Sequence, residues 1–433
     1  MSKTRRRWAI DLRPLAIPSY RRMWIGTAFS NYGYQFTAVA VPVEMFSLTD
    51  NSFWVGLLGV AALVPLLVFG LWGGALADAM DRRKLLIAGS VVMWLGTLGF
   101  LVQSLLEWDE PWVLLVFTAV QSCAFALTNP TRSAIIPRLV PANQVPAANT
   151  LSFTTGEAAV VLGPLTVGVI LATWDLHTAL PIAYGADALL FTVGLWSTLR
   201  LPAIPPAAQA AKAGLRSVVE GFRYLAGAPV LLLSFAIDII AMTIAMPRAL
   251  FPEIADERFG GGAAVGFLFS AIAIGSVLGG LTSGWIGRVR RQGLALVAAV
   301  VAWGALVGLA GLAHDLWLMV LVLALAGAAD LVSAVFRHSI LLVYAPDQMR
   351  GRLQGVMTVV VAGGPRLGDL RAGGTAAIWG AGAAFSIGGF AAAGLAIALA
   401  LVFPALTRYR SPDPQAEPDP RPAAAPEPIS SGP

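Results

Sequence analysis

Three acidic residues lie inside long apolar stretches of the sequence, where a carboxyl group can bind and release a proton away from bulk water. Glu157, Asp187 and Asp238 each lie about ten residues or fewer from an end of such a stretch. At about 1.5 Å per helical residue, that position is deep inside a bilayer. A charged side chain there costs about 2.5–3.5 kcal/mol, which favours the neutral form. We therefore expect proton-coupling groups among these three residues.

A second group of charges lies in the segment Gly363-Gly364-Pro365-Arg366-Leu367-Gly368-Asp369-Leu370-Arg371. The Gly-Gly-Pro run within an apolar stretch predicts a broken helix. Arg366 and Asp369 are three residues apart and are able to pair, which leaves Arg371 in need of a second acid. One interpretation is a self-neutralised structural pair. The other is a cationic spot that attracts an anionic ligand or keeps a coupling acid deprotonated.

Polar and aromatic side chains within residues 23–47 and 112–130 are suited to a bulky amphipathic ligand. The cavity candidates are Asn31, Tyr34, Gln35, Gln121 and Asn129. Hydrogen bonds between helices are the alternative role for half of them. Two further acids lie nearer the ends of their stretches: we expect Asp330 to neutralise Arg337 or another base, and Glu44 to be solvated.

The composition requires that these residues be carried by elements that cross a membrane. Of the 433 residues, 57% are apolar and 12% are charged, and the mean hydropathy is +0.74. A soluble domain is nearer ~45–50% apolar and ~25% charged. With a single cysteine, Cys123, and three scattered histidines, we expect no disulfide and no metal site. No lysine follows a glycine, so we expect neither an ATPase phosphate loop nor a cofactor.

Twelve apolar runs are long enough to cross a bilayer as helices. They cover residues 23–47, 53–77, 85–106, 112–130, 150–173, 178–199, 230–252, 263–287, 292–313, 316–336, 353–377 and 380–405. Lysine and arginine, including Arg132 and Arg138, concentrate in alternate connecting segments and at both ends, so we expect both termini in the cytoplasm. The excess of 29 basic over 24 acidic residues is therefore a topology signal rather than a sign of nucleic-acid binding.

The chain divides around a central linker. We expect a cytoplasmic N-terminal segment (1–22), a six-helix half (23–200), a linker with an amphipathic helix (201–229), a second six-helix half (230–406) and a disordered cytoplasmic tail (407–433). Residues of the two halves repeat at a fixed offset, since Arg132 and Arg337 are 205 apart, as are Gly163 and Gly368. Parallel six-helix repeats are typical of carriers with a ligand site between the halves.

The loop after the second run contains the motif Gly73-Gly74-Ala75-Leu76-Ala77-Asp78-Ala79-Met80-Asp81-Arg82-Arg83-Lys84. It resembles the loop 2–3 signature of the major facilitator superfamily, with Asp81 in place of a usual glycine. The matching positions are Gly74, Asp78, Arg82 and Arg83. Asp78 and Arg82 are four residues apart and are able to pair along a helix. In that family the acid also docks against the other half, which implies a gating role; a basic stop-transfer cluster is the alternative.

Further segments are similar to the enterobactin-exporter branch of this superfamily, which also contains multidrug exporters. They are residues 201–206, 221–225, 249–255 and 346–352. The pair Gly163-Pro164 resembles the span-five motif of the family's exporters and predicts a kink, with a small-residue packing seam as the alternative. Span seven lines the central cavity in this family, so the resemblance ranks Asp238 first for proton coupling. Glu157 follows, and Asp187 is third because a structural hydrogen bond is its more ordinary role.

The resemblance implies an all-α membrane protein with twelve transmembrane helices in two six-helix repeats that alternate access between the two sides. We expect a secondary transporter that couples proton entry to export of a siderophore or a bulky amphipathic drug-like compound. We expect a monomer in the inner membrane whose partners are the substrate, protons and lipid. Facilitated uptake or uniport is one alternative, and a non-transporting membrane sensor or accessory subunit is another. Enzymatic activity is not expected.

Overall fold

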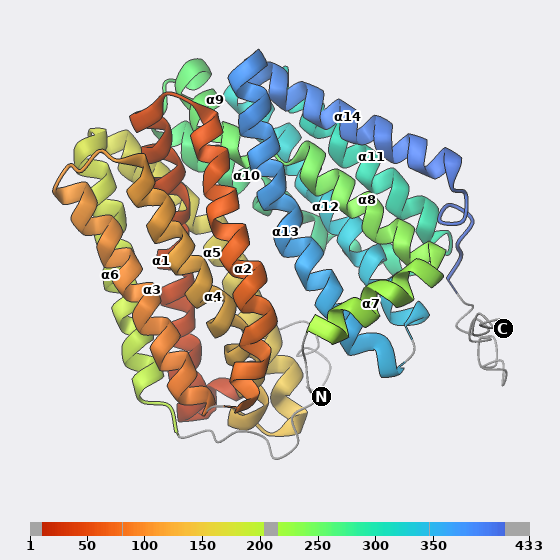
Figure 1. The fold of residues 1–433 in the computed structure, drawn as a ribbon, viewed down its shortest axis with the longest axis horizontal. Helices are drawn as coiled ribbons and strands as arrows, with labels where there is room; N and C mark the ends of the chain where they lie inside the picture. The colour runs from red at the N-terminus through yellow and green to blue at the C-terminus, as the bar shows by residue number, and fades with distance from the viewer. Residues whose placement is uncertain (1–10, 80, 203–214, 346, 412–433) are drawn as a thin grey trace, which may run out of the picture.

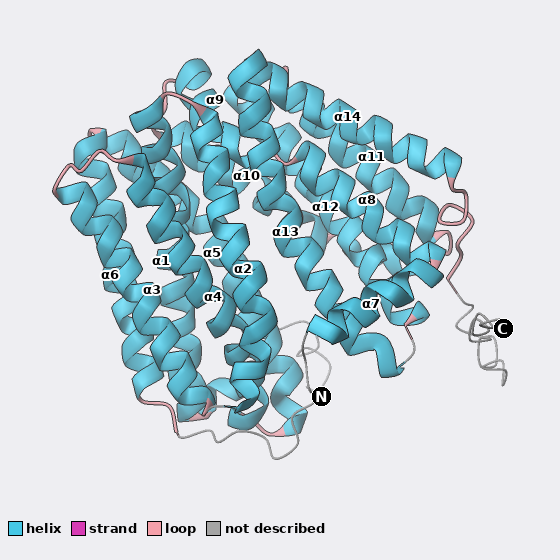
Figure 2. Cartoon of the chain, viewed as in Figure 1, coloured by secondary structure: helices cyan, strands magenta, loops and turns pink. Residues whose placement is uncertain are grey.

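The computed structural model describes residues 11–79, 81–202, 215–345 and 347–411. Within these residues the chain consists of helices joined by short loops, and no strand is present (Figure 2). The α-helices are α1 (Pro18–Thr49), α2 (Ser52–Ala79), α3 (Arg82–Leu105), α4 (Pro111–Leu139), α5 (Val145–Thr173), α6 (Leu176–Leu199), α7 (Leu215–Gly227), α8 (Pro229–Ala245), α9 (Phe251–Phe259), α10 (Ala263–Leu281), α11 (Gln292–Gly311), α12 (Leu316–Tyr344), α13 (Asp347–Trp379) and α14 (Ala381–Val402). Four short 3-10 helices are η1 (Arg13–Ala16), η2 (Ala142–Gln144), η3 (Arg248–Leu250) and η4 (Ser283–Arg288).

All twelve predicted spans coincide with helices. Ten helical segments of the described residues are long and apolar enough to cross a membrane, and one of these, Pro229–Phe259, combines α8, η3 and α9. The other two are α1 and α13, which have 32 and 33 residues and carry more polar side chains. The all-α, twelve-helix membrane fold is therefore confirmed.

The helices form two bundles that repeat the same packing plan (Figure 1). In the first bundle α1 packs on α6, α2 on α4 and α3 on α4; in the second, α8 packs on α14, α10 on α12 and α11 on α12. Helices α4 and α12 begin 205 residues apart and end 205 residues apart. The repeat seen in the sequence is therefore a repeat of structure. Helix α7 occupies the linker segment in which a short helix is predicted.

Several helices are longer than their apolar runs, and the additions lie at one end of the molecule. Helices α4 and α12 continue past the predicted ends at residues 130 and 336. Helices α5 and α13 begin before the predicted starts at residues 150 and 353. Hydropathy marks only the part of a helix that lies in lipid, so polar turns beyond it are missed. Figure 1 shows these extensions at the end of the molecule near α7.

Helix α13 corrects one expectation, because it runs without a break through Pro365. A proline inside a helix leaves a carbonyl without its usual N–H partner, and a membrane helix tolerates this when other donors compensate. Pro365 leaves the carbonyl of Val361 without its N–H donor. In the next position the guanidinium of Arg366 donates to the Ala362 carbonyl at 2.6 Å. The predicted broken helix is therefore wrong. The predicted disordered tail from residue 412 lies outside the described residues. Residues 203–214 of the predicted linker also lie outside them.

The two bundles meet most closely toward α9. A side chain at Gly56 of α2 would put its Cβ 2.6 Å from the backbone oxygen of Asp369 on α13. A side chain at Gly168 of α5 would put its Cβ 2.9 Å from the Cα of Gly266 on α10. These glycines permit backbone contact between the halves. Figure 1 shows α2 and α13 side by side near α9 and spreading apart toward α7.

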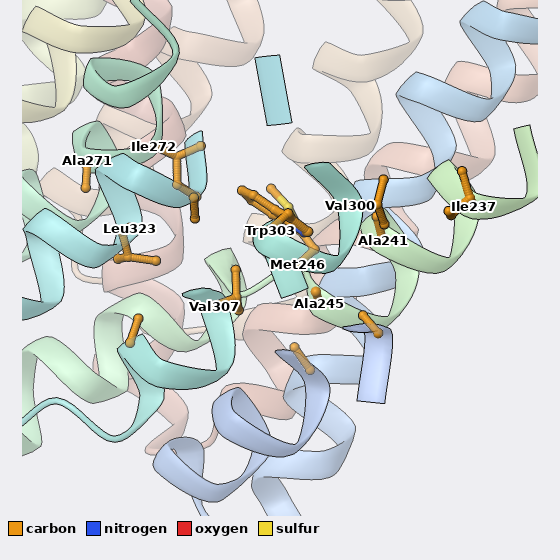
Figure 3. Close-up of a cluster of buried hydrophobic side chains, with 14 of the residues drawn as sticks. Ile237, Ala241, Ala245, Met246, Ala271, Ile272, Val300, Trp303, Val307 and Leu323 are labelled. Atoms are coloured by element: carbon orange, nitrogen blue, oxygen red, sulfur yellow. The ribbon is translucent and has the colours of Figure 1, made fainter. Parts of the chain in front are cut away.

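The second bundle has an apolar core centred on Trp303 of α11 (Figure 3). The core also contains Ile237 and Ala241 of α8 and Leu323 of α12. Any charged group in such a core must be compensated by a partner. Asp238 follows Ile237 directly and is 1% exposed, so its partner determines what it can do.

Candidate functional site

A cavity of about 330 Å3 lies between the two bundles. The first bundle contributes α1 to α5 to its wall, and the second contributes η3, α10 and α13. The predicted candidates that line it are Tyr34, Gln35, Gln121, Arg366 and Asp369. This volume is at the lower end of the range of ligand pockets.

The cavity carries more positive than negative charge. Arg248 and Arg366 line it, and Asp369 is the acid in the wall. Asp369 accepts a hydrogen bond from the backbone N–H of Ala249 at 3.2 Å, whereas Arg366 donates to its own helix. Arg366 and Asp369 form no direct ion pair, although Arg248 and Arg366 both act on this carboxyl group electrostatically. Two guanidinium groups to one carboxyl group leave net positive charge in the wall for an anion.

Arg248 is a cavity residue that sequence reasoning missed. Helix α8 ends at Ala245, short of the predicted residue 252, because Pro247 interrupts it. The chain then turns through η3, which presents Arg248 to the cavity with its side chain exposed. A proline followed by a base near the end of an apolar run is the signal that was available.

Asp187 lies directly behind the cavity wall in the first bundle. It is 1% exposed, and its Oδ2 accepts a hydrogen bond from the hydroxyl of Thr37 at 2.5 Å. The hydroxyl of Thr97 lies 3.4 Å from the same oxygen and accepts a hydrogen bond from Gln121 at 3.0 Å. Thr37 and Gln121 both line the cavity. Polar groups therefore connect this carboxyl group to the cavity, and no base among the described residues lies beside it.

Glu44 is a second buried acid of the first bundle, and here the expectation of a solvated residue is wrong. It is 5% exposed and accepts hydrogen bonds from Gln103 at 2.7 Å and from the hydroxyl of Tyr184 at 2.5 Å. Helix α6 supplies the tyrosine and α3 the amide, so three helices meet at this carboxyl group. The position near a helix end gave no indication of these partners.

Asp238 lies inside the second bundle. It lines neither the cavity between the bundles nor a second cavity that lies within the first bundle. Its Oδ1 pairs with the guanidinium of Arg337 on α12, and the two residues are 1% and 4% exposed. The sequence assigned Arg337 to Asp330, but its ion pair is with Asp238. Asp330 remains close enough to Arg337 to interact with it electrostatically. The first-ranked carboxylate is therefore held by a base in a dry core.

Glu157 lies on α5, half-buried, and forms no hydrogen bond or ion pair with the residues that the structure describes. Val160 and Pro164, on the next turns of α5, line the cavity. A side chain at Gly163 would clash with Gln35, so this glycine lets α5 approach α1 closely. Helix α5 remains continuous through Pro164.

Comparison with known proteins identifies the lineage. A family model described as transmembrane secretion effector matches residues 9–429. The enterobactin exporters EntS of Shigella boydii serotype 18 and Escherichia coli O81 are each 30% identical over 417 residues, which is 94% of this chain and 97% of theirs. The chain belongs to the major facilitator superfamily, in its enterobactin-exporter branch.

Solved structures agree on the fold of this major facilitator. The nucleoside transporter NupG superposes with a TM-score of 0.70 at 15% identity, covering 90% of this chain and 100% of that one. A bacterial homologue of the human lysosomal transporter Spinster, in an inward-facing and unoccupied conformation, gives 0.67 at 15% identity, covering 90% and 96%. The chain is thus a multi-pass secondary transporter and not an enzyme.

The superfamily's loop motif is only partly visible. Gly74 and Asp78 lie in the last turns of α2, and their side chains are outside the described residues. The carboxyl group of Asp81 caps α3 by accepting the N–H of Arg83 at 2.8 Å, which gives this departure from the usual glycine a structural role. The side chain of Arg83 donates to the Leu199 carbonyl at 2.7 Å and so ties α3 to the end of α6. Arg82 begins α3.

The other predicted charges and amides lie apart from the central cavity. Arg371 points between α13 and α14, where its guanidinium lies 3.5 Å from Thr375 Oγ1 and from the Ala384 carbonyl. It finds carbonyl and hydroxyl partners instead of the expected second acid. Asn31 and Asn129 line a second cavity, within the first bundle of this transporter.

Proposed function

We propose that this transporter exports an anionic, aromatic compound of the siderophore class, driven by protons that enter in exchange. The observation that carries the proposal is the central cavity, in which two guanidinium groups face one acid among aromatic side chains. The rings in its wall are Tyr34, Phe100, Phe125 and Phe269. Catecholates and aromatic carboxylates combine a flat ring with negative charge. The guanidinium group of arginine can lie over the ring and can also pair with the charge. The relatives named enterobactin exporters support the same class of substrate.

We further propose a monomer in the inner membrane with both termini in the cytoplasm. The proposed organisation keeps the halves at 23–200 and 230–406, with the linker 201–229 and the end segments 1–22 and 407–433 on the cytoplasmic side. Excess lysine and arginine in those segments support this orientation. Because the bundles touch near α9 and spread apart toward α7, the proposed orientation makes this an inward-facing state.

Asp187 is the coupling carboxyl group that the geometry favours. Thr37 and Gln121 connect it to the cavity, and no base neutralises it. Asp238 is less favoured because it is paired with the guanidinium of Arg337 inside the second bundle. Glu157 is the remaining candidate, since it is half-buried on a cavity-lining helix without a partner among the described residues. The proposed cycle exchanges a proton on Asp187 for the anion on Arg248 and Arg366.

The test is flux in proteoliposomes that contain the purified full chain, a trapped pH dye and the enterobactin-type triscatecholate as substrate. Export predicts that an imposed pH gradient drives the siderophore against its concentration gradient, with protons moving the opposite way. Siderophore movement without proton movement would instead indicate uniport or facilitated uptake. No siderophore movement in either direction would overturn the proposed substrate and favour a sensor or accessory role.

A further inference from the structure

A second cavity, of about 350 Å3, lies within the first bundle and is separate from the interface between the halves. Its wall comes from α1, α3, α4, α5 and α6. The aromatic residues that line it are Trp24, Tyr34, Phe125, Phe153 and Phe191. Among the residues that the structure describes, Arg132 of α4 is the base in this wall, and no acid lines it. A ring-lined space with one cation has the composition of a site for an aromatic anion.

Two donors in this wall have no acceptor among the described residues. Within the described residues the guanidinium of Arg132 forms neither a hydrogen bond nor an ion pair, and no acidic side chain acts on it electrostatically. The buried indole N–H of Trp24 likewise has no acceptor among those residues. For the buried indole N–H this lack of an acceptor costs about 1–3 kcal/mol, whereas the guanidinium of Arg132 is half-buried and carries a charge without an acidic partner among the described residues. A bound anion would supply an acceptor to each.

The repeat shows that the two equivalent arginines differ in their counter-charge. Arg337, 205 residues after Arg132, pairs with Asp238 of α8. Helix α1 takes the place of α8 in the first bundle, and its one acid, Glu44, lies near its far end and is bonded to other residues. The second acid near Arg337 is Asp330, and the residue 205 positions earlier is Phe125. Neither counter-charge of Arg337 has an acidic equivalent beside Arg132 among the described residues, and a ring stands at the position of one of them.

We infer that this cavity is a second substrate site, which binds an aromatic carboxylate or catecholate between Arg132 and the surrounding rings before it reaches the central cavity. The route rests on the proposed export function, whereas the binding site does not. The aromatic pair Tyr34 and Phe125 lines both cavities, with ring centroids 6.2 Å apart and planes at 14°. A change in the side-chain rotamer of either ring would join the two spaces, so this pair is the partition between the sites.

The experiment is equilibrium dialysis of radiolabelled salicylate against the full chain in phosphatidylcholine nanodiscs. We expect two molecules bound per wild-type chain and one per Arg132→Gln chain. Arg138→Gln, an exposed base on the same helix, is the matched control and should retain two. Phe153→Ala changes an exposed cavity residue without a core contact, and should weaken one of the two sites about tenfold.

Arg132→Gln chain that binds as many molecules as the wild type, or wild-type chain that binds none, would overturn the inference. Loss of both molecules in Arg132→Gln while Phe153→Ala binds like the wild type would also overturn it. The binding result can be distinguished from the transport result. If the wild-type chain binds two salicylates but moves no siderophore, the inferred site stands and the proposed transport function is wrong.

Discussion

Arg132 and Arg337 occupy equivalent positions on α4 and α12, yet their surroundings are opposite. Arg337 is buried against Asp238 in the apolar core of the second bundle. Arg132 faces an aromatic cavity in the first bundle, and no described acid lies in its wall. One helix arrangement thus holds a fixed ion pair in one half and an open cationic site in the other.

The buried acids differ between the halves in the same way. In the first bundle Asp187 and Glu44 are hydrogen-bonded by hydroxyl and amide groups. In the second, Asp238 is neutralised by a guanidinium group. An acid that faces only neutral donors can change its charge at lower cost than one that would leave a buried cation behind. Asp187 and Glu44 can therefore take up or release a proton at lower cost than Asp238.

The largest expected effect concerns the equivalent arginines. Arg337→Gln leaves Asp238 buried without its partner and should lower the free energy of unfolding by about 3–5 kcal/mol. Arg132→Gln breaks no bond to the described residues and should lower it by less than about 1 kcal/mol. Chemical unfolding of both variants in the same lipid measures the difference. Equal losses would contradict the contrast between the two bundles.

The next effect concerns the bases of the central cavity. Arg248→Gln and Arg366→Gln each remove a charge-assisted bond to the anion and should weaken siderophore binding about tenfold or more. The difference in affinity between wild type and variant should shrink as salt is added, because salt screens the attraction between the arginine and the anion. Titration of the purified variants measures it, with Arg138→Gln as the control. Wild-type affinity in both variants would remove these bases from the site.

A smaller effect is expected at the contact between the halves near α9. Ser52 of α2 donates a hydrogen bond to Glu253 of α9, which also accepts the backbone N–H of Ala381 at 3.2 Å. Ser52→Ala should open this end in about fivefold more molecules, since one such bond contributes about 1 kcal/mol. Ser47→Ala, whose hydroxyl bonds within α1, is the matched control.

Spin labels at Glu107→Cys and His314→Cys in a Cys123→Ser background report on that opening. These positions lie in the loops after α3 and after α11, one in each half. We expect the long-distance population to grow in Ser52→Ala and to stay constant in Ser47→Ala. An unchanged distribution in Ser52→Ala would show that the glycine contacts alone hold this end closed.

The sequence predicted the helices well, because apolar runs of about 20 residues have few alternatives in a bilayer. It also predicted a cavity wall from Tyr34, Gln35 and Gln121, since amides and rings within a span are conspicuous. The sequence did not predict which side chains of different helices pair with one another. Nothing local indicates that Asp238 meets a base 99 residues away, or that Asp187 meets Thr37.

Local exceptions were also missed. The position of Arg248 depends on Pro247 ending α8 early, which hydropathy does not register. Arg132 was interpreted as a marker of topology, but the helix continues past the apolar run and places it in a cavity wall. Both residues follow or neighbour a proline near the end of a span, where the regular pattern of a membrane helix changes.

The most direct measurement is proton-driven siderophore export by Asp187→Asn beside Asp238→Asn and Glu157→Gln, with Asp256→Asn as the exposed control, in proteoliposomes matched for folded protein. The account predicts that Asp187→Asn still binds the siderophore and exchanges it across the membrane at equal concentrations, but no longer responds to a pH gradient. Glu157→Gln and the control should respond like the wild type, and Asp238→Asn should lose folded protein rather than coupling. Full gradient-driven export by Asp187→Asn would contradict the account.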